Sequence, residues 1–196
     1  MMFFLVSALL VTSAAQDGAA SPAPETLQIA PQVEFRTPQE RLTNRLDALA
    51  SASEAEARPL VDEIRALWAH SGSDTISLLM DRGMAAEAAG ETELAARMYD
   101  HVTQLAPEFA EGWLAAGRMA SAAEDWAFAF EALNTALTLE PRRFDAYLTL
   151  GRVLEQAEAI NAALDAYEEA LSIYPAYTPA LQAKARIDAA RAGRAL

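Results

Sequence analysis

The chain has no cysteine and only two histidines, His70 and His101, among its 196 residues. Without cysteine there is no disulfide, no thiolate metal site and no thiol nucleophile. The two histidines lie on separate predicted helices, where packing or surface roles are more common than metal binding. The sequence also lacks a glycine-rich phosphate loop and a G-x-S-x-G motif. We therefore expect no catalytic residues, no bound metal and no cofactor.

Basic residues are scarce as well. Lys and Arg number 15 against 28 Asp and Glu, which gives a formal net charge of −13 and an isoelectric point near 4.5. A nucleic-acid-binding surface needs positive charge, so this composition argues against a nucleic-acid partner. Hydrophobic residues make up 53% of the chain, and many of them are alanine, which suits closely packed helices better than strands.

The apolar run at residues 2–11 is too short to span a bilayer, which takes about 20 residues, but it has the length of a signal-peptide core. Ser13, Ala14 and Ala15 form a small-residue cleavage site, so residues 1–15 are predicted to be a signal peptide and Gln16 the mature start. No Lys or Arg precedes the run, which leaves open an uncleaved membrane anchor, or a misassigned start upstream of a cytoplasmic domain. No cysteine follows the cleavage site, which excludes a lipoprotein. We expect a bacterial periplasmic or envelope protein without a stable transmembrane anchor, and a flexible Pro- and Ala-rich linker over 16–36.

A repeat dominates the rest of the sequence. Four kinds of residue recur every 34 positions: Gly83, Gly117 and Gly151; Ala95, Ala129 and Ala163; Leu105, Leu139 and Ile173; Pro107, Pro141 and Pro175. A fixed period of about 20–50 residues is typical of repeat proteins. The sequence therefore predicts three repeats over 73–175, with units at 76–109, 110–143 and 144–177.

Each recurring position has a physical reason. A glycine inside a helix costs about 1 kcal/mol relative to alanine, so its recurrence predicts a second helix in close approach. The alanine twelve residues later is expected to be the facing contact, and Leu105, Leu139 and Ile173 are expected to anchor the end of that second helix in the core. The prolines stop one helix or start the next. Each unit is therefore predicted to be a pair of antiparallel helices.

This pattern resembles the tetratricopeptide repeat family. The middle unit matches the family pattern at Trp113, Gly117, Ala129, Leu133, Ala136 and Pro141, and the third at Tyr147, Leu150, Gly151, Ala163, Tyr167, Ala170 and Pro175. The first unit matches at Leu79, Gly83, Ala95, Tyr99 and Pro107, but has Arg82 where leucine is usual and Val102 where alanine is usual. The resemblance implies an all-α fold, a right-handed α-solenoid of helix pairs.

Helical segments are also predicted on both sides of the repeats. Thr37 to Glu40 and Ser53 to Glu56 read as capping boxes, and residues 37–72 are predicted to form a divergent N-terminal hairpin that covers the first repeat. Residues 176–196 are predicted to form a capping helix, with Leu181 and Ile187 facing the last repeat.

The resemblance also implies that the first helices of successive repeats line a concave groove that binds peptide segments. Carrying the family positions over gives the candidate groove residues Met80, Met84, Glu111, Leu114, Arg118, Asp145, Leu148, Arg152 and Glu155. Arg118 and Arg152 occupy equivalent positions and could anchor an acidic, partly apolar segment. Alternatively, they pair with groove carboxylates such as Glu111, Asp145 and Glu155.

One specialisation within the family does not fit this sequence. Members that clamp the C-terminal carboxylate of chaperones use Lys, Asn and Arg at positions that correspond here to Met80, Met84, Ala115, Asp145 and Thr149. None of these residues matches, and Asp145 has the wrong charge.

The sequence predicts a non-catalytic scaffold or adaptor that binds another protein or peptide partner. The alternatives are a regulatory subunit or enzyme with a site built across the groove, and a self-assembling structural protein of the envelope.

Overall fold

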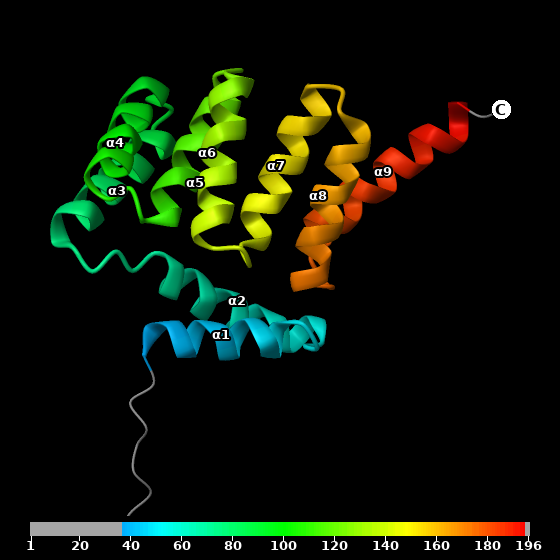
Figure 1. Ribbon diagram of the computed structural model, residues 1–196, viewed down its shortest axis with the longest axis horizontal. Helices are drawn as coiled ribbons and strands as arrows, with labels where there is room; N and C mark the ends of the chain where they lie inside the picture. The colour runs from blue at the N-terminus through cyan, green and yellow to red at the C-terminus, as the bar shows by residue number, and fades with distance from the viewer. Residues whose placement is uncertain (1–36, 195–196) are drawn as a thin grey trace, which may run out of the picture. The chain divides into compact units, whose positions relative to one another are not determined.

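The computed structural model describes the backbone of residues 37–194, so the predicted signal peptide and linker, 1–15 and 16–36, lie outside the described residues. Every regular element within 37–194 is an α-helix, which confirms the all-α prediction. The helices, shown in Figure 1, are α1 (Pro38–Leu49), α2 (Glu54–Trp68), α3 (Asp74–Ala88), α4 (Thr92–Leu105), α5 (Ala110–Ala122), α6 (Trp126–Leu139), α7 (Phe144–Gln156), α8 (Ile160–Ile173) and α9 (Thr178–Arg194).

Helices α3 to α8 form three pairs, and each pair packs against the next. α3 packs on α4, α5 on α6 and α7 on α8, while α4 and α6 each contact the first helix of the following pair and α8 contacts α9 (Figure 1). α5 also touches α7 directly, and a hydrogen bond from Arg118 to Glu87 joins α5 to α3. The first helices α3, α5 and α7 therefore form one layer, called here the inner layer. This is the α-solenoid that the 34-residue period predicts.

The glycines are indeed where helices approach closely. A Cβ added to Gly83 would lie 2.5 Å from Cε1 of Tyr99, and one added to Gly117 would lie 2.9 Å from Cγ of Leu133. Tyr167 approaches Gly151 more closely still. The residue that faces each glycine therefore lies one helical turn after the alanine that was predicted to face it. The prediction for Ala95, Ala129 and Ala163 is wrong in this respect, although all three alanines are fully buried.

The unusual Val102 of the first repeat also has an explanation. Its Cγ1 would lie 2.5 Å from a Cβ added to Gly112, which opens the next repeat. In the two later repeats the equivalent pairs are Ala136 with Ala146 and Ala170 with Ala180, all fully buried. The larger side chain in one helix is therefore compensated by the loss of a side chain in its neighbour.

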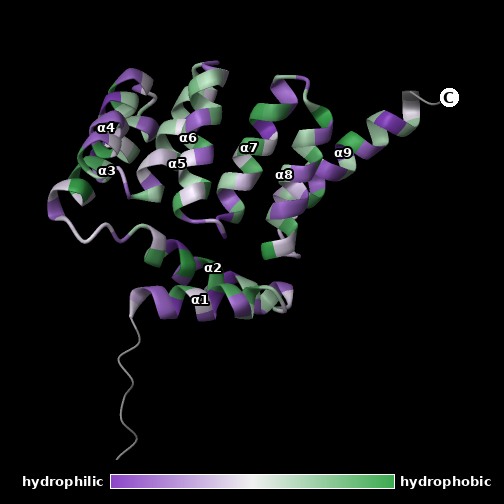
Figure 2. Ribbon diagram, in the orientation of Figure 1, coloured by the Kyte–Doolittle hydropathy of each residue, from purple (hydrophilic) through white to green (hydrophobic). Residues whose placement is uncertain are grey.

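The prediction for the end of the second helices is correct only in the third repeat. Ile173 is 9% exposed, but Leu105 and Leu139 at the equivalent positions are 64% and 38% exposed. α6 carries two more exposed apolar side chains, Phe128 and Phe130, and Figure 2 colours much of this helix as hydrophobic. Burial of Ile173 needs a cover that the first two repeats lack.

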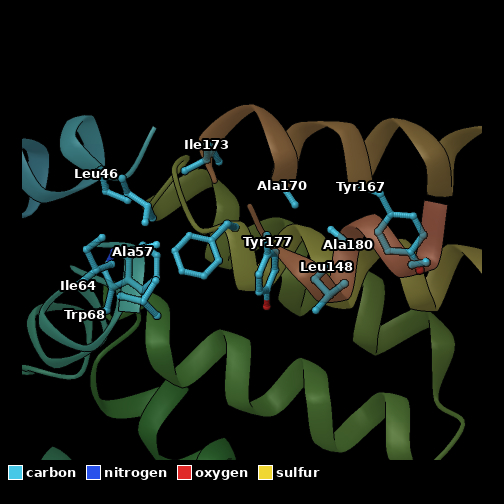
Figure 3. Close-up of a cluster of buried hydrophobic side chains, with 14 of the residues drawn as sticks. Leu46, Ala57, Ile64, Trp68, Leu148, Tyr167, Ala170, Ile173, Tyr177 and Ala180 are labelled. Atoms are coloured by element: carbon cyan, nitrogen blue, oxygen red, sulfur yellow. The ribbon is translucent and has the colours of Figure 1, made fainter. Parts of the chain in front are cut away.

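The N-terminal hairpin, α1 and α2, provides that cover. Leu46 and Ile64 share one core cluster with Ile173 and Tyr177, and Figure 3 shows the hairpin side chains beside those from α8 and the start of α9. The ring of Trp68 lies 5.3 Å from that of Phe144 between centroids. The prediction that the hairpin covers the first repeat is therefore wrong, because it packs against the third.

The reason lies in the distribution of aromatic residues. The third repeat and the turn that follows it carry Phe144, Tyr174 and Tyr177, whose rings contact one another at 5.0 to 5.4 Å. One repeat earlier, the same positions hold Ala110, Glu140 and Arg143. Two repeats earlier they hold Ile76, Ala106 and Phe109. The third repeat is thus the one that offers all three rings to the apolar face of the hairpin.

The last helix, α9, occupies the position that the first helix of a fourth repeat would have. Ala180, Ala183 and Ile187 are buried against the third repeat, as the capping role requires. Leu181, expected to face the repeat, is instead 45% exposed. Its equivalents are Trp113 and Tyr147, which are only partly buried.

Candidate functional site

The candidate groove residues divide into core and surface groups. Met80, Leu114 and Leu148 are 2–7% exposed and belong to the hydrophobic cores, so they support the inner layer rather than offer contacts to a partner. Met84 is 50% exposed, and Arg152 is also exposed. The charged candidates differ from one another in their partners.

Arg118 is held by the first repeat. Its Nη2 donates to Oε2 of Glu87 at 2.7 Å, and the hydroxyl of Tyr99 donates to the same oxygen at 3.0 Å. Burial and the bond to Glu87 raise the pKa of the Tyr99 hydroxyl well above its usual range. The three groups bridge α3, α4 and α5, so Arg118 already has a carboxylate partner.

Glu155 takes part in a second bridge of the same kind. The hydroxyl of Tyr167 donates to its Oε1 at 2.6 Å, and Nη2 of Arg186 lies 2.7 Å from both carboxylate oxygens. Arg186 comes from α9, so this bridge joins the third repeat to the capping helix. Glu155 therefore stabilises the array and is not a free groove carboxylate.

The two bridges occupy equivalent positions two repeats apart. Tyr99, Glu87 and Arg118 correspond to Tyr167, Glu155 and Arg186. Between them, the set in the same register is Leu133, Ser121 and Arg152, which has no phenol and no carboxylate. Arg152 makes no ion pair and no side-chain hydrogen bond with any residue of 37–194.

Glu111 and Asp145 belong to a buried cluster around Arg143. Nη2 of Arg143 lies 2.5 Å from Glu111 Oε2, and its Nε and Nη2 lie 3.1 Å from the two oxygens of Asp145. The guanidinium carbon sits 4.5 Å from the ring centroid of Trp68. Burial alone would lower the pKa of Arg143, but the charges of Asp145 and Glu111 outweigh it, so the pKa is raised and the group stays charged.

The internal pairing raised as an alternative for the groove arginines is found for Arg118, with Glu87 as its partner, but not for Arg152. Glu111 and Asp145 pair with Arg143, and Glu155 pairs with Arg186, so none of the three pairs with Arg118 or Arg152. The sequence analysis missed Arg143. The sequence does contain an indication of its role. The equivalent residues in the other repeats are Phe109 and Tyr177, and an arginine at an otherwise aromatic position indicates that acidic partners surround it.

The hydroxyl of Tyr177 is influenced both by this cluster and by Arg152. Burial, followed by the negative charge of Asp145, raises the pKa of the Tyr177 hydroxyl to about 12, whereas the positive charges of Arg65 and Arg152 oppose that rise. Arg65 comes from α2 and Arg152 from α7, so the hairpin and the inner layer both bring positive charge close to this hydroxyl. Arg65, like Arg152, has no ion pair in the described part of the chain.

Residues 37–194 contain no group of three or more His, Asp or Glu side chains placed to hold a metal ion. None of the helices in this range combines the length and the apolar character needed to cross a membrane.

Comparisons with known proteins agree with this architecture. A family model described as tetratricopeptide repeat matches residues 144–177, the range predicted for the third repeat. No curated protein matches the chain. Among solved structures, the Arabidopsis OM64 TPR domain is 18% identical, with 59% of this chain and 95% of that one covered and a TM-score of 0.57.

Two other solved structures are similar. The first TPR of Spaghetti (RPAP3), bound to the HSP90 peptide SRMEEVD, is 20% identical, covers 61% of this chain and 95% of its own, and has a TM-score of 0.59. MamA is 21% identical, with 74% and 78% covered and a TM-score of 0.54. At these identities the likeness concerns the fold. Residues 144–177 are thus a tetratricopeptide repeat, within an array of three in-register helix pairs that has the tetratricopeptide repeat fold.

Proposed function

We propose that this protein is a non-catalytic scaffold or adaptor that holds a segment of a partner protein against the inner layer α3, α5 and α7. The observation that carries the proposal is the state of the inner-layer side chains. The charged candidates Glu111, Arg118, Asp145 and Glu155 are paired within the chain, whereas Arg152 has no ion pair among residues 37–194 and Met84 is half-exposed. A similar fold in the first TPR of RPAP3 holds an HSP90 peptide, which supports peptide binding as a use of this architecture.

The partner is expected to differ from that HSP90 peptide in its mode of attachment. The positions that would clamp a chaperone carboxylate hold Met80, Met84, Ala115, Asp145 and Thr149, none of which is basic. Asp145 is in addition paired with Arg143. Any acidic group of the partner must therefore be held elsewhere on the inner layer.

An enzymatic role has weaker support. The most deeply buried charged group of the described residues, Arg143, is neutralised by two carboxylates and covered by the Trp68 ring. A catalytic group needs access to a substrate and a pKa matched to proton transfer. Arg143 meets neither requirement, so its cluster is better explained as a structural link.

Photo-crosslinking at two matched positions tests the proposal. A photoreactive amino acid replaces Met84 on the inner layer, 50% exposed, or Phe130 on α6, 45% exposed, in the full-length protein in its native cells. We expect a discrete partner adduct from position 84 and none from position 130. Adducts from position 130 alone would place the binding surface on the second helices and overturn the proposal.

We also propose that the protein is exported to the periplasm or cell envelope of a bacterium. The support is the sequence of residues 2–15 alone, with its short apolar run and small-residue cleavage site. N-terminal sequencing of the native protein should give Gln16 as the first residue. Recovery of a chain that begins at Met1 from the cytoplasm would contradict export.

A further inference from the structure

The junction between the second and third repeats keeps an arginine but lacks its acceptor. At the junction of repeats one and two, Glu87 accepts from Arg118, and at the junction with α9, Glu155 accepts from Arg186. In both cases the carboxylate comes from the preceding first helix, 31 residues before the arginine. The residue 31 positions before Arg152 is Ser121.

The change at Ser121 is matched by a change at the facing residue. In the first and third repeats a tyrosine ring covers the glycine, and its hydroxyl donates a hydrogen bond to the glutamate one turn after that glycine. Tyr99 donates to Glu87 in this way, and Tyr167 to Glu155. In the second repeat Leu133 covers Gly117 instead, and it has no hydroxyl to donate. A carboxylate at position 121 would thus lose one of its donors, while Arg152 would still be in reach of it.

Among residues 37–194, no other carboxylate pairs with Arg152. Asp145 and Glu155, the acidic residues of α7 nearest to Arg152 in the chain, are engaged by Arg143 and by Arg186 with Tyr167. In a chain of net charge −13, Arg152 is thus a positive group of the inner layer that has no carboxylate partner among residues 37–194.

We propose that Arg152 binds a carboxylate of the partner segment, which enters beside Ser121 and takes the place that Glu87 and Glu155 fill at the other two junctions. The proposal rests on the proposed function, because it specifies the partner chemistry at that same groove. The internal bridges show what such a contact looks like, with an arginine nitrogen 2.7 Å from a carboxylate oxygen. A charge-assisted hydrogen bond of this kind is stronger than one between neutral groups. The carboxylate belongs to an Asp or Glu side chain or to a free C-terminus.

Selection from a pool of random dodecapeptides displayed on phage tests the proposal on the full-length protein. Three variants are used in parallel: the wild type, Arg152→Gln, and Arg97→Gln as a control that removes the same charge from α4, where Arg97 is 62% exposed. We expect wild type and Arg97→Gln to enrich peptides with an acidic residue at one fixed position. Arg152→Gln should lose that preference.

The best wild-type peptide is then synthesised in three forms: unchanged, with its acidic residue replaced by the amide, and with an amidated C-terminus. The unchanged peptide should bind Arg152→Gln roughly ten- to a hundredfold more weakly than wild type, the range expected for a hydrogen bond to a charged group. Whichever modified peptide shows the same loss with wild type identifies the source of the carboxylate.

The outcomes separate the two proposals. If wild type selects peptides without an acidic preference, or if Arg152→Gln selects the same acidic peptides as wild type, the role of Arg152 is overturned and peptide binding stands. If wild type selects no peptide at all, the proposed function falls, and the role of Arg152 falls with it. Circular dichroism confirms in each case that the variants are folded.

Discussion

Two neighbouring junctions of the repeat array are held together in different ways. Between repeats one and two, Val102 fills the space over Gly112, and Glu87 ties Arg118 to the first repeat. Between repeats two and three, a pair of alanines replaces the valine and glycine, and the ionic link runs from the buried Arg143 back to Glu111.

The difference shows that the repeat register fixes the backbone but not the polar contacts. The link of Arg118 lies near the C-terminal end of α3, whereas that of Arg143 lies where α5 and α7 begin. Because Arg143 secures the second junction at one end, Arg152 at the other end is not needed for stability. The proposed binding role of Arg152 would therefore cost the array no internal ionic link.

The largest effect is expected from Arg143→Met. It leaves Glu111 and Asp145 partly buried without their partner, and removal of one member of a buried ion pair costs about 3–5 kcal/mol. Urea unfolding monitored by circular dichroism measures the loss. Arg118→Met is the matched change at the first junction and should cost far less, because Arg118 and Glu87 are both more than a third exposed.

A compensated variant sharpens this prediction. When Glu111→Gln and Asp145→Asn are added to Arg143→Met, the unpaired charges disappear and much of the lost stability should return. Failure of the triple variant to recover stability would mean that packing of the arginine against Trp68, rather than its charge, supports the junction.

An intermediate effect is expected from Gly112→Ala. The added Cβ would meet Val102, and overpacking of a core costs typically about 1–3 kcal/mol. Val102→Ala in the same chain recreates the alanine pair of the next junction, so the double variant should be more stable than Gly112→Ala alone. A double-mutant cycle from urea unfolding gives the coupling, and strictly additive losses would contradict the size compensation.

The smallest effect on stability is expected from Arg118→Gln. The pair with Glu87 is partly exposed, so its loss should lower the unfolding free energy by less than about 1 kcal/mol, and salt should reduce the difference further. Thermal unfolding at low and high salt measures it. A loss as large as that of Arg143→Met would remove the distinction drawn between the two junctions.

The sequence predicts the repeats well, because their positions are fixed by close packing. Glycine, buried alanine and proline at a constant spacing leave few alternatives to stacked helix pairs, and the structure has them. The capping box at Thr37 and Glu40 is also formed, with both reciprocal hydrogen bonds. Such local patterns depend on neighbours in the chain and can be read directly.

The hairpin and the charged contacts are harder to predict. An apolar stripe such as Leu42, Leu46 and Leu49 specifies that a face is buried but not which surface buries it, so the choice of the third repeat depends on aromatic residues about a hundred positions away. Arginine side chains are long enough to reach several carboxylates, so residue type alone does not identify the partner. Comparison of equivalent positions across repeats supplies part of that information, as for Leu133, Ser121 and Arg152.

On the proposal for Arg152, the residue at position 121 decides whether this arginine is free to bind a partner. Calorimetric titration of the peptide selected by wild type into Ser121→Glu and Ser121→Gln tests it most directly. Ser121→Glu supplies the missing carboxylate in register and should weaken binding at least about tenfold, while Ser121→Gln, equal in size but neutral, should stay near the wild-type affinity. Wild-type affinity in a folded Ser121→Glu variant would contradict the claim, as would an equal loss in both variants.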